Sequence, residues 1–155
     1  MSSKRWPSGR LRNLERINSL APEPTSPEEI GAFIEAGRAH LNDARTVSLS
    51  VLGRFQLAYM AAHAFALAAL RANDLRTAAR EGHRVLVFQV LPDSVGTTQA
   101  VSLTLVRAHA KRNEAEYVGI VDTTEGDVAD LIKVTSQLEA ALVAWLRSYR
   151  PELLG

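Results

Sequence analysis

Apolar residues recur at intervals of three and four along most of the chain, the spacing that aligns them on one face of an α-helix. The first clear stripe contains Ile30, Phe33, Ile34 and Leu41. Long helices are expected over residues 27–47, 52–73 and 98–118 and from about Thr124 onward, and shorter ones over 10–20 and 85–91. The pattern therefore predicts an all-α protein, a four- to five-helix up-down bundle.

Local signals support several of these helix starts. Ser26-Pro27-Glu28-Glu29 combines a serine cap, a proline in the first turn and a glutamate three positions after the cap. Ser50 is expected to cap the next helix, which is rich in alanine and apolar on nearly all sides. A helix of that kind is buried by several neighbours, so residues 52–73 are predicted to lie at the centre of the bundle.

The segments between the helices are less regular. Residues 21–24, with two prolines, predict a linker, residues 74–82 a polar loop and residues 93–97 a turn. The valine-rich segment 85–91 could form a strand, but an isolated strand has no partner elsewhere in the chain, so a short helix is preferred. We therefore expect a basic amino-terminal arm and linker over residues 1–25 and the bundle over 26–150.

Composition excludes several classes of site. The chain contains no cysteine, which rules out disulfides, thiolate metal ligands and a cysteine nucleophile, and it has no HExxH or comparable metal-binding spacing. The longest apolar stretch, residues 57–70, is too short to span a membrane and is interrupted by Tyr59 and His63. With no apolar block near its start like that of a secretory signal, the sequence predicts a soluble cytoplasmic protein with no metal, no cofactor and no membrane association.

The net charge of +1 is unevenly distributed. Residues 1–20 contain five basic residues against Glu15, a balance of +4, so the remaining 13 basic and 16 acidic residues leave −3. Such an arm could contact phosphates or an acidic partner. A solvated or self-docking segment is the preferred interpretation, because five charges are few for binding a polyanion.

The most informative polar cluster lies near the end of the 98–118 helix. Its members, spaced three and four residues apart and so sharing one face, are His109, Arg112, Asn113, Glu116 and Tyr117. One interpretation is a buried network that fastens this helix to the 52–73 helix and to the final helix. The other is a binding site in which Arg112 grips an anion while Asn113 and Tyr117 donate hydrogen bonds.

Tyr59 and His63 are further candidates, four residues apart on the predicted central helix. We include both among the candidate binding residues. A histidine in such a position is more often a core residue than a catalyst, and that is the preferred interpretation of His63.

These features together resemble the HEPN superfamily of prokaryotic helical-bundle proteins. The resemblance covers roughly residues 30–145 and rests on residues 55–63, on Gly82-His83-Arg84 and on Arg112-Asn113-Glu114-Ala115-Glu116-Tyr117. It implies a bundle of four or five helices, a homodimer and a place in a toxin-antitoxin or other defence system, with RNA or a small protein as partner. Many members of that superfamily are metal-independent ribonucleases.

The chain departs from the nuclease members, in which an arginine is followed after four to six residues by a histidine. In this chain a gap of four residues separates Arg112 from Tyr117, and an unperturbed phenol with a pKa of about 10 is a poor base at neutral pH. A literal match at Arg76 and His83 lies in a different segment, and roughly one match of that kind is expected by chance.

We therefore expect a non-catalytic or weakly catalytic component that associates with RNA or with a protein partner. An atypical ribonuclease that uses Arg112 and Tyr117, or a neighbouring histidine, is the first alternative. A purely structural interaction protein, in which the polar cluster only fastens helices together, is the second.

Overall fold

A computed structural model describes residues 8–78, 83–118 and 122–155, and for residues 83 and 115–118 it describes the backbone alone. Short β-strands accompany a mainly helical chain. The elements are α1 (Gly9–Arg16), β1 (Leu20–Pro22), α2 (Pro27–Ala44), α3 (Val51–Arg71), β2 (Leu75–Thr77), α4 (His83–Gln89), α5 (Leu91–Ser94), α6 (Gln99–Val118), α7 (Glu125–Tyr149) and the 3₁₀ turn η1 (Pro151–Leu154). The predicted all-α helical bundle is confirmed.

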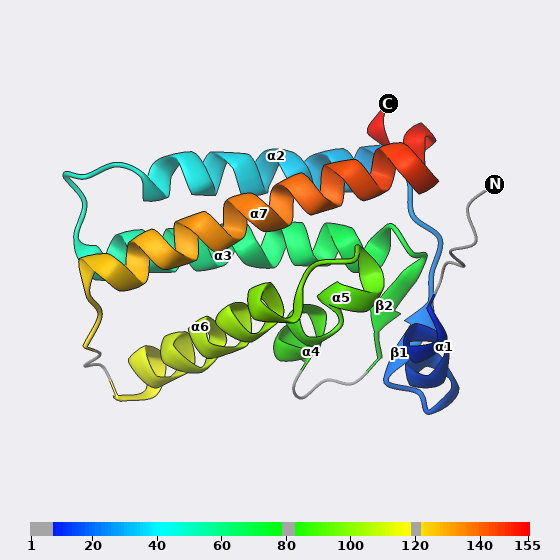
Figure 1. Ribbon diagram of the computed structural model, residues 1–155, viewed down its shortest axis with the longest axis horizontal. Helices are drawn as coiled ribbons and strands as arrows, with labels where there is room; N and C mark the ends of the chain where they lie inside the picture. The colour runs from blue at the N-terminus through cyan, green and yellow to red at the C-terminus, as the bar shows by residue number, and fades with distance from the viewer. Residues whose placement is uncertain (1–7, 79–82, 119–121) are drawn as a thin grey trace.

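The long helices α2, α3, α6 and α7 alternate in direction along the chain (Figure 1). α2 and α7 both lie beside α3, and α4, α5 and α6 contact α3 on its other side (Figure 1). α3 is therefore the helix around which the others are arranged, as its sequence predicts.

The alanines of α3 explain how its neighbours come so close. Seven of them are buried: Ala58, Ala61, Ala62, Ala64, Ala66, Ala68 and Ala69. At the contact with α2, Phe65 is fully buried and its ring covers Gly37 so closely that a Cβ on that glycine would lie 2.6 Å from the ring. Because these side chains are small, the backbones of the neighbouring helices can approach one another closely and still leave no empty space between them.

The predicted caps are present. The hydroxyl of Ser26 accepts a hydrogen bond from the backbone N–H of Glu29 at 3.1 Å, and that of Ser50 accepts one from Gly53 at 2.9 Å. Thr124 and Asp127 form a reciprocal capping box at the start of α7. These bonds satisfy N–H groups that have no partner within their helix. Gly119, which follows the helix predicted over 98–118 and is of the residue type that commonly ends a helix, lies outside the described residues.

Two predictions about the connections are wrong. The expected linker and loop each contribute a strand, and β1 pairs with β2 in antiparallel register, Leu20 opposite Thr77 and Pro22 opposite Leu75. The expected 85–91 segment is helical, but it forms α4 followed by the separate α5, which extends into the predicted turn. Pro92 occupies the first turn of α5, where a missing N–H costs nothing.

A buried arginine holds this sheet to the bundle. The guanidinium of Arg71 donates to the backbone carbonyls of Glu23 at 2.7 Å, Pro24 at 2.8 Å and Leu75 at 3.0 Å, and it forms an ion pair with Glu29 at 2.9 Å. One side chain at the end of α3 thus joins the segment before α2 to the segment after α3. The charge is buried but well partnered.

The amino-terminal segment packs onto the same unit from residue 8 onward. Leu11 of α1 and Leu20 of β1 are fully buried in the common core. Ile17 lies within the helix predicted over residues 10–20, where its spacing from Leu11 and Leu14 favours the buried side. It is instead 67% exposed, because α1 ends at Arg16 and Asn18 adopts a left-handed conformation (φ 63°). Lys4 and Arg5, part of the expected basic arm, lie outside the described residues.

Within the described residues, no helix is both long enough and apolar enough to cross a membrane.

The contact between Gly37 and Phe65 predicts that replacing Gly37 with alanine changes the stability of the fold differently from the same replacement at Gly31. Gly37→Ala should destabilise the fold by about 1–2 kcal/mol, because overpacking outweighs the better helix propensity of alanine. Gly31→Ala is the matched control on α2, since an added Cβ there meets nothing within 4 Å, and it should stabilise slightly. Urea unfolding of both variants tests this, and equal shifts would contradict the close packing.

The ion pair of Glu29 predicts an acid-sensitive stability. The hydrogen bond from Arg71 holds the pKa of Glu29 below its ordinary value of 4.5, so the stabilisation is present above that pH and is lost as pH falls below it. Urea unfolding from pH 6 to roughly pH 3 should therefore show a smaller loss of stability for Glu29→Gln than for the wild type. Glu28→Gln, at the exposed neighbour, is the control and should follow the wild type.

Candidate ligand-binding site

The predicted polar residues of α6 meet those of α3. The hydroxyl of Tyr59 lies 2.9 Å from Nδ1 of His109, and Nδ2 of Asn113 lies 3.1 Å from Nε2 of the same ring. The guanidinium carbon of Arg112 stands 5.4 Å from the centre of the Tyr59 ring. We call these four residues together with His63 the α3–α6 cluster.

The hydrogen bonds determine the tautomer of His109. Because the amide N–H of Asn113 donates to Nε2, the proton of the neutral ring is on Nδ1 and is donated to the hydroxyl oxygen of Tyr59. Both ring nitrogens of His109 are therefore engaged within the protein. This arrangement positions the ring and leaves it poorly suited to exchange protons with a bound molecule.

Aromatic packing encloses the inner side of the cluster. Phe88 of α4 is fully buried and contacts the rings of Tyr59, His63 and His109 at centroid distances of 5.8, 6.0 and 6.4 Å. Tyr59 itself is only 2% exposed. The inner half of the cluster thus fastens α3, α4 and α6 together.

The outer half opens into a cleft of about 370 Å³, which we call the Arg112 cleft. It is lined by Phe33, Ala36 and His40 of α2, by Tyr59, Met60, His63, Ala64 and Leu67 of α3, by Arg84 of α4 and by Arg112 of α6. Arg112 is half-buried at this cleft and is not enclosed by the bundle. The cleft combines an apolar floor with two guanidinium and two imidazole groups, and its described lining includes no aspartate or glutamate.

Sequence reasoning missed two charged or ionisable residues of this cleft, Arg84 and His40. Arg84 is half-buried and follows His83 in a segment that was noted only for its resemblance to a family. His40 neighbours the apolar stripe of α2, next to Leu41. Arg84 has no helical spacing that relates it to the residues of α3 or α6, so only the packing of α4 against α3 shows that it lines the cleft.

Two predicted members remain untested. Glu116 and Tyr117 lie on the last turn of α6, and their side chains are outside the described part of the structure. The predicted pairs of Arg112 with Glu116 and of Asn113 with Tyr117 therefore stay predictions. So does the Arg76 and His83 pair, because the side chain of His83 is likewise not described.

An ion pair of Lys111 joins α6 to the final helix. The described hydrogen bonds of His109 and Asn113 lead to α3 and within α6, whereas Lys111 reaches α7 through an ion pair with Asp127 at 2.8 Å. Consecutive residues of α6 thus face different neighbours.

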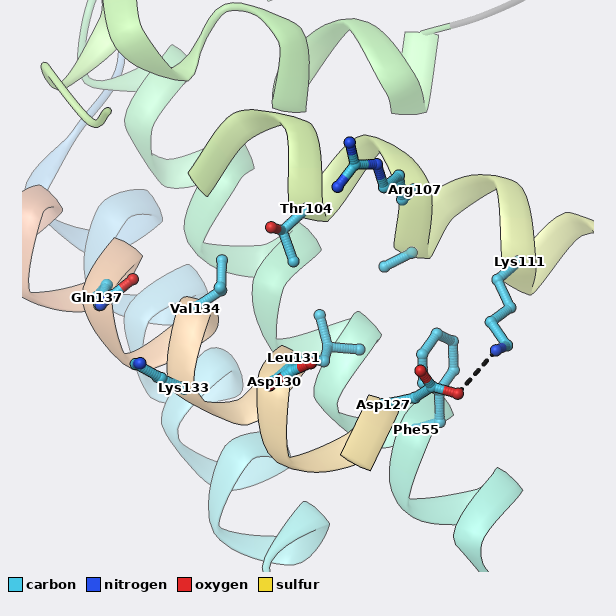
Figure 2. Close-up of a pocket in the computed structure, with 11 residues that line it drawn as sticks. Phe55, Thr104, Arg107, Lys111, Asp127, Asp130, Leu131, Lys133, Val134 and Gln137 are labelled. Carbon is cyan, nitrogen blue, oxygen red and sulfur yellow. Dashed lines mark hydrogen bonds and ion pairs between the residues drawn. The ribbon is translucent and has the colours of Figure 1, made fainter. Parts of the chain in front are cut away.

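A second pocket, of about 540 Å³, lies between α6 and α7 and is called the α6–α7 pocket (Figure 2). Its lining comprises Thr104, Arg107, Ala108 and Lys111 of α6, Asp127, Asp130, Leu131, Lys133, Val134 and Gln137 of α7, and Phe55 of α3. The ion pair between Lys111 and Asp127 closes one end of it (Figure 2). Both walls therefore carry charged side chains above an apolar floor.

Within the described residues, no three histidine, aspartate or glutamate side chains converge as metal ligands would. Comparison of the chain with protein-family models, with curated proteins and with solved structures gives no match.

The shared histidine predicts that substitutions on either side of it are coupled. Tyr59→Phe removes the hydroxyl that accepts from His109, and Asn113→Ala removes the amide that sets its tautomer; each should cost about 1 kcal/mol. In a double-mutant cycle the two effects should be non-additive by at least about 0.5 kcal/mol, because both act through one ring. Unfolding free energies that simply add would show that the two bonds do not form a network.

Proposed function

We propose that this chain is a HEPN-like helical-bundle protein that binds RNA at the Arg112 cleft without cleaving it efficiently. The observation that supports this most directly is the lining of the cleft. Two guanidinium groups, from α4 and α6, border an apolar floor that has no described carboxylate beside it. A site of this composition favours a ligand that is both anionic and partly apolar.

Single-stranded RNA has that chemistry. Its phosphates suit the forked donors of Arg84 and Arg112, and an unstacked base can lie on apolar side chains such as Met60, which is 46% exposed. A double helix would present phosphates but no free base face. The proposal is therefore for unpaired RNA.

Inefficient catalysis follows from the state of the histidines. His109, the histidine nearest to Arg112 in sequence, has both ring nitrogens engaged by Tyr59 and Asn113. The residue at the position of the nuclease histidine is Tyr117. Neither group is well suited to accept a proton from a ribose hydroxyl at neutral pH.

A second candidate function is supported by one observation. His40 and His63 line the same cleft as Arg112 and could supply the imidazole that the sequence motif lacks. In that case the chain is an atypical metal-independent endoribonuclease, with Arg112 stabilising the scissile phosphate and one of these histidines or Tyr117 moving the proton.

The resemblance also leads us to propose a cytoplasmic homodimer through helices that border the Arg112 face, within a toxin-antitoxin or defence system. A small protein partner remains an alternative ligand for this face. A third reading, that the cluster only fastens the helices, is separated from the others by the stability measurements below.

Binding of a fluorescently labelled, unstructured RNA at low salt tests the proposal. Arg112→Ala and Arg84→Ala should each weaken binding and reduce the slope of log K against log salt by about 0.7, the value for one phosphate contact on a single strand. Arg12→Ala, which removes an exposed arginine on α1, is the matched control and should change neither quantity. No binding by the wild type at low salt would overturn the proposal.

Two further measurements separate the alternatives. Incubation of the same RNA with wild-type protein and chelator should leave it intact, and cleavage that His63→Ala abolishes would favour the nuclease. If Arg112→Ala mainly lowers the melting temperature and leaves RNA affinity unchanged, the cluster is structural.

A further inference from the structure

The α6–α7 pocket is a separate site whose chemistry differs from that of the Arg112 cleft. We propose that it binds an amphipathic monoanion, a molecule with an apolar body and a single carboxylate group. This inference does not depend on the proposed RNA binding, because the two pockets share no lining residue.

The pocket has the size and the floor of a small-molecule site. Its volume of about 540 Å³ lies within the range of ligand pockets between helices of bundles. The floor is formed by Phe55, Ala108 and Leu131, whose exposed fractions are only 3%, 6% and 2%. An apolar body placed on them would lose contact with water without displacing any polar group of the protein.

Lys111 supplies the recognition of the anionic end. Its side chain is 27% exposed, and its ammonium donates one hydrogen bond to Asp127 at 2.8 Å. An ammonium has three N–H donors, so two of them remain for a ligand at that end of the pocket (Figure 2). Arg107, one turn earlier on α6, makes no hydrogen bond or ion pair within the described part of the chain and adds a second positive charge to the same wall.

The acidic residues restrict the charge of the ligand. Asp127 is already engaged, since the same carboxylate oxygen that accepts from Lys111 also accepts from the backbone N–H of Thr124 at 2.9 Å. Those bonds, the one from Lys111 foremost, hold the pKa of Asp127 below its ordinary value and keep it charged. Asp130 stands exposed on the α7 wall. The described lining carries three cationic side chains, Lys133 among them, against these two carboxylates, a net charge of +1. A monoanionic carboxylate therefore suits the pocket better than a dianionic phosphate monoester.

Calorimetric titration of the full chain with sodium octanoate tests the proposal. Octanoate should bind with a dissociation constant of roughly 10 µM to 1 mM, the range open to a ligand of this size. Octyl phosphate, largely dianionic above pH 7, and octylammonium should bind roughly ten-fold more weakly or not at all.

Two variants that break the same ion pair should have opposite effects. Lys111→Met removes the donor and should weaken octanoate binding, whereas Asp127→Asn frees the ammonium and should strengthen it by roughly three- to ten-fold. Both substitutions remove one bond between α6 and α7, so a purely structural role would shift the two affinities in the same direction. Asp130→Asn, at an exposed position, should also strengthen binding and does not depend on the ion pair.

A variant in the Arg112 cleft tests whether octanoate binds in the α6–α7 pocket. Arg112→Ala should leave octanoate affinity unchanged. The assignment is overturned if octanoate does not bind up to millimolar concentration, or if octylammonium binds equally well. It is also overturned if Arg112→Ala abolishes binding, or if Lys111→Met and Asp127→Asn shift the affinity in the same direction. Failure of RNA binding would leave this result unaffected.

Discussion

The close packing of α3 is the constraint on which the rest of the structure depends. Its buried alanines allow α2 and α7 to approach on one side while α4, α5 and α6 cover the other. On the covered sides of such a helix a polar residue cannot be left without a hydrogen-bond partner. Tyr59 therefore needs partners from its neighbours, and the bond to His109 is the consequence. The candidate site follows from the burial of the helix that carries it.

A second constraint concerns the end of α3. Burial of the Arg71 guanidinium is tolerated because three backbone carbonyls and Glu29 surround it. Those carbonyls belong to β2 and to the segment directly after β1, and two three-residue strands are too short to be stable alone. The charge thus holds the irregular part of the chain in place, and through β1 it also positions the amino-terminal helix. The stability of the two-stranded sheet and the burial of the Arg71 guanidinium therefore depend on each other.

The accuracy of sequence reasoning varies with the distance over which each interaction acts. The starts of α2 and α7 were predictable because Ser26 and Thr124 cap residues only three positions away. The pairing of Leu20 with Thr77 was not, because three-residue strands carry no readable alternation and their partner lies far along the chain. Ile17 was misplaced because a left-handed residue, Asn18, ended the helix one turn early.

In the candidate site, too, contacts within one helix were predictable from the sequence, and contacts between helices were not. Helical spacing correctly placed His109, Arg112 and Asn113 on neighbouring positions of α6, and it also placed Tyr59 and His63 together on α3. Spacing could not show that Arg84 joins them, since that depends on how α4 docks. Nor could it show that Lys111 belongs to a different pocket. Consecutive side chains on an α-helix point about 100° apart, so Lys111 and Arg112 can face separate clefts on different sides of one helix. α6 is therefore the partition between two chemically distinct pockets, and each can be altered without a change in the lining of the other.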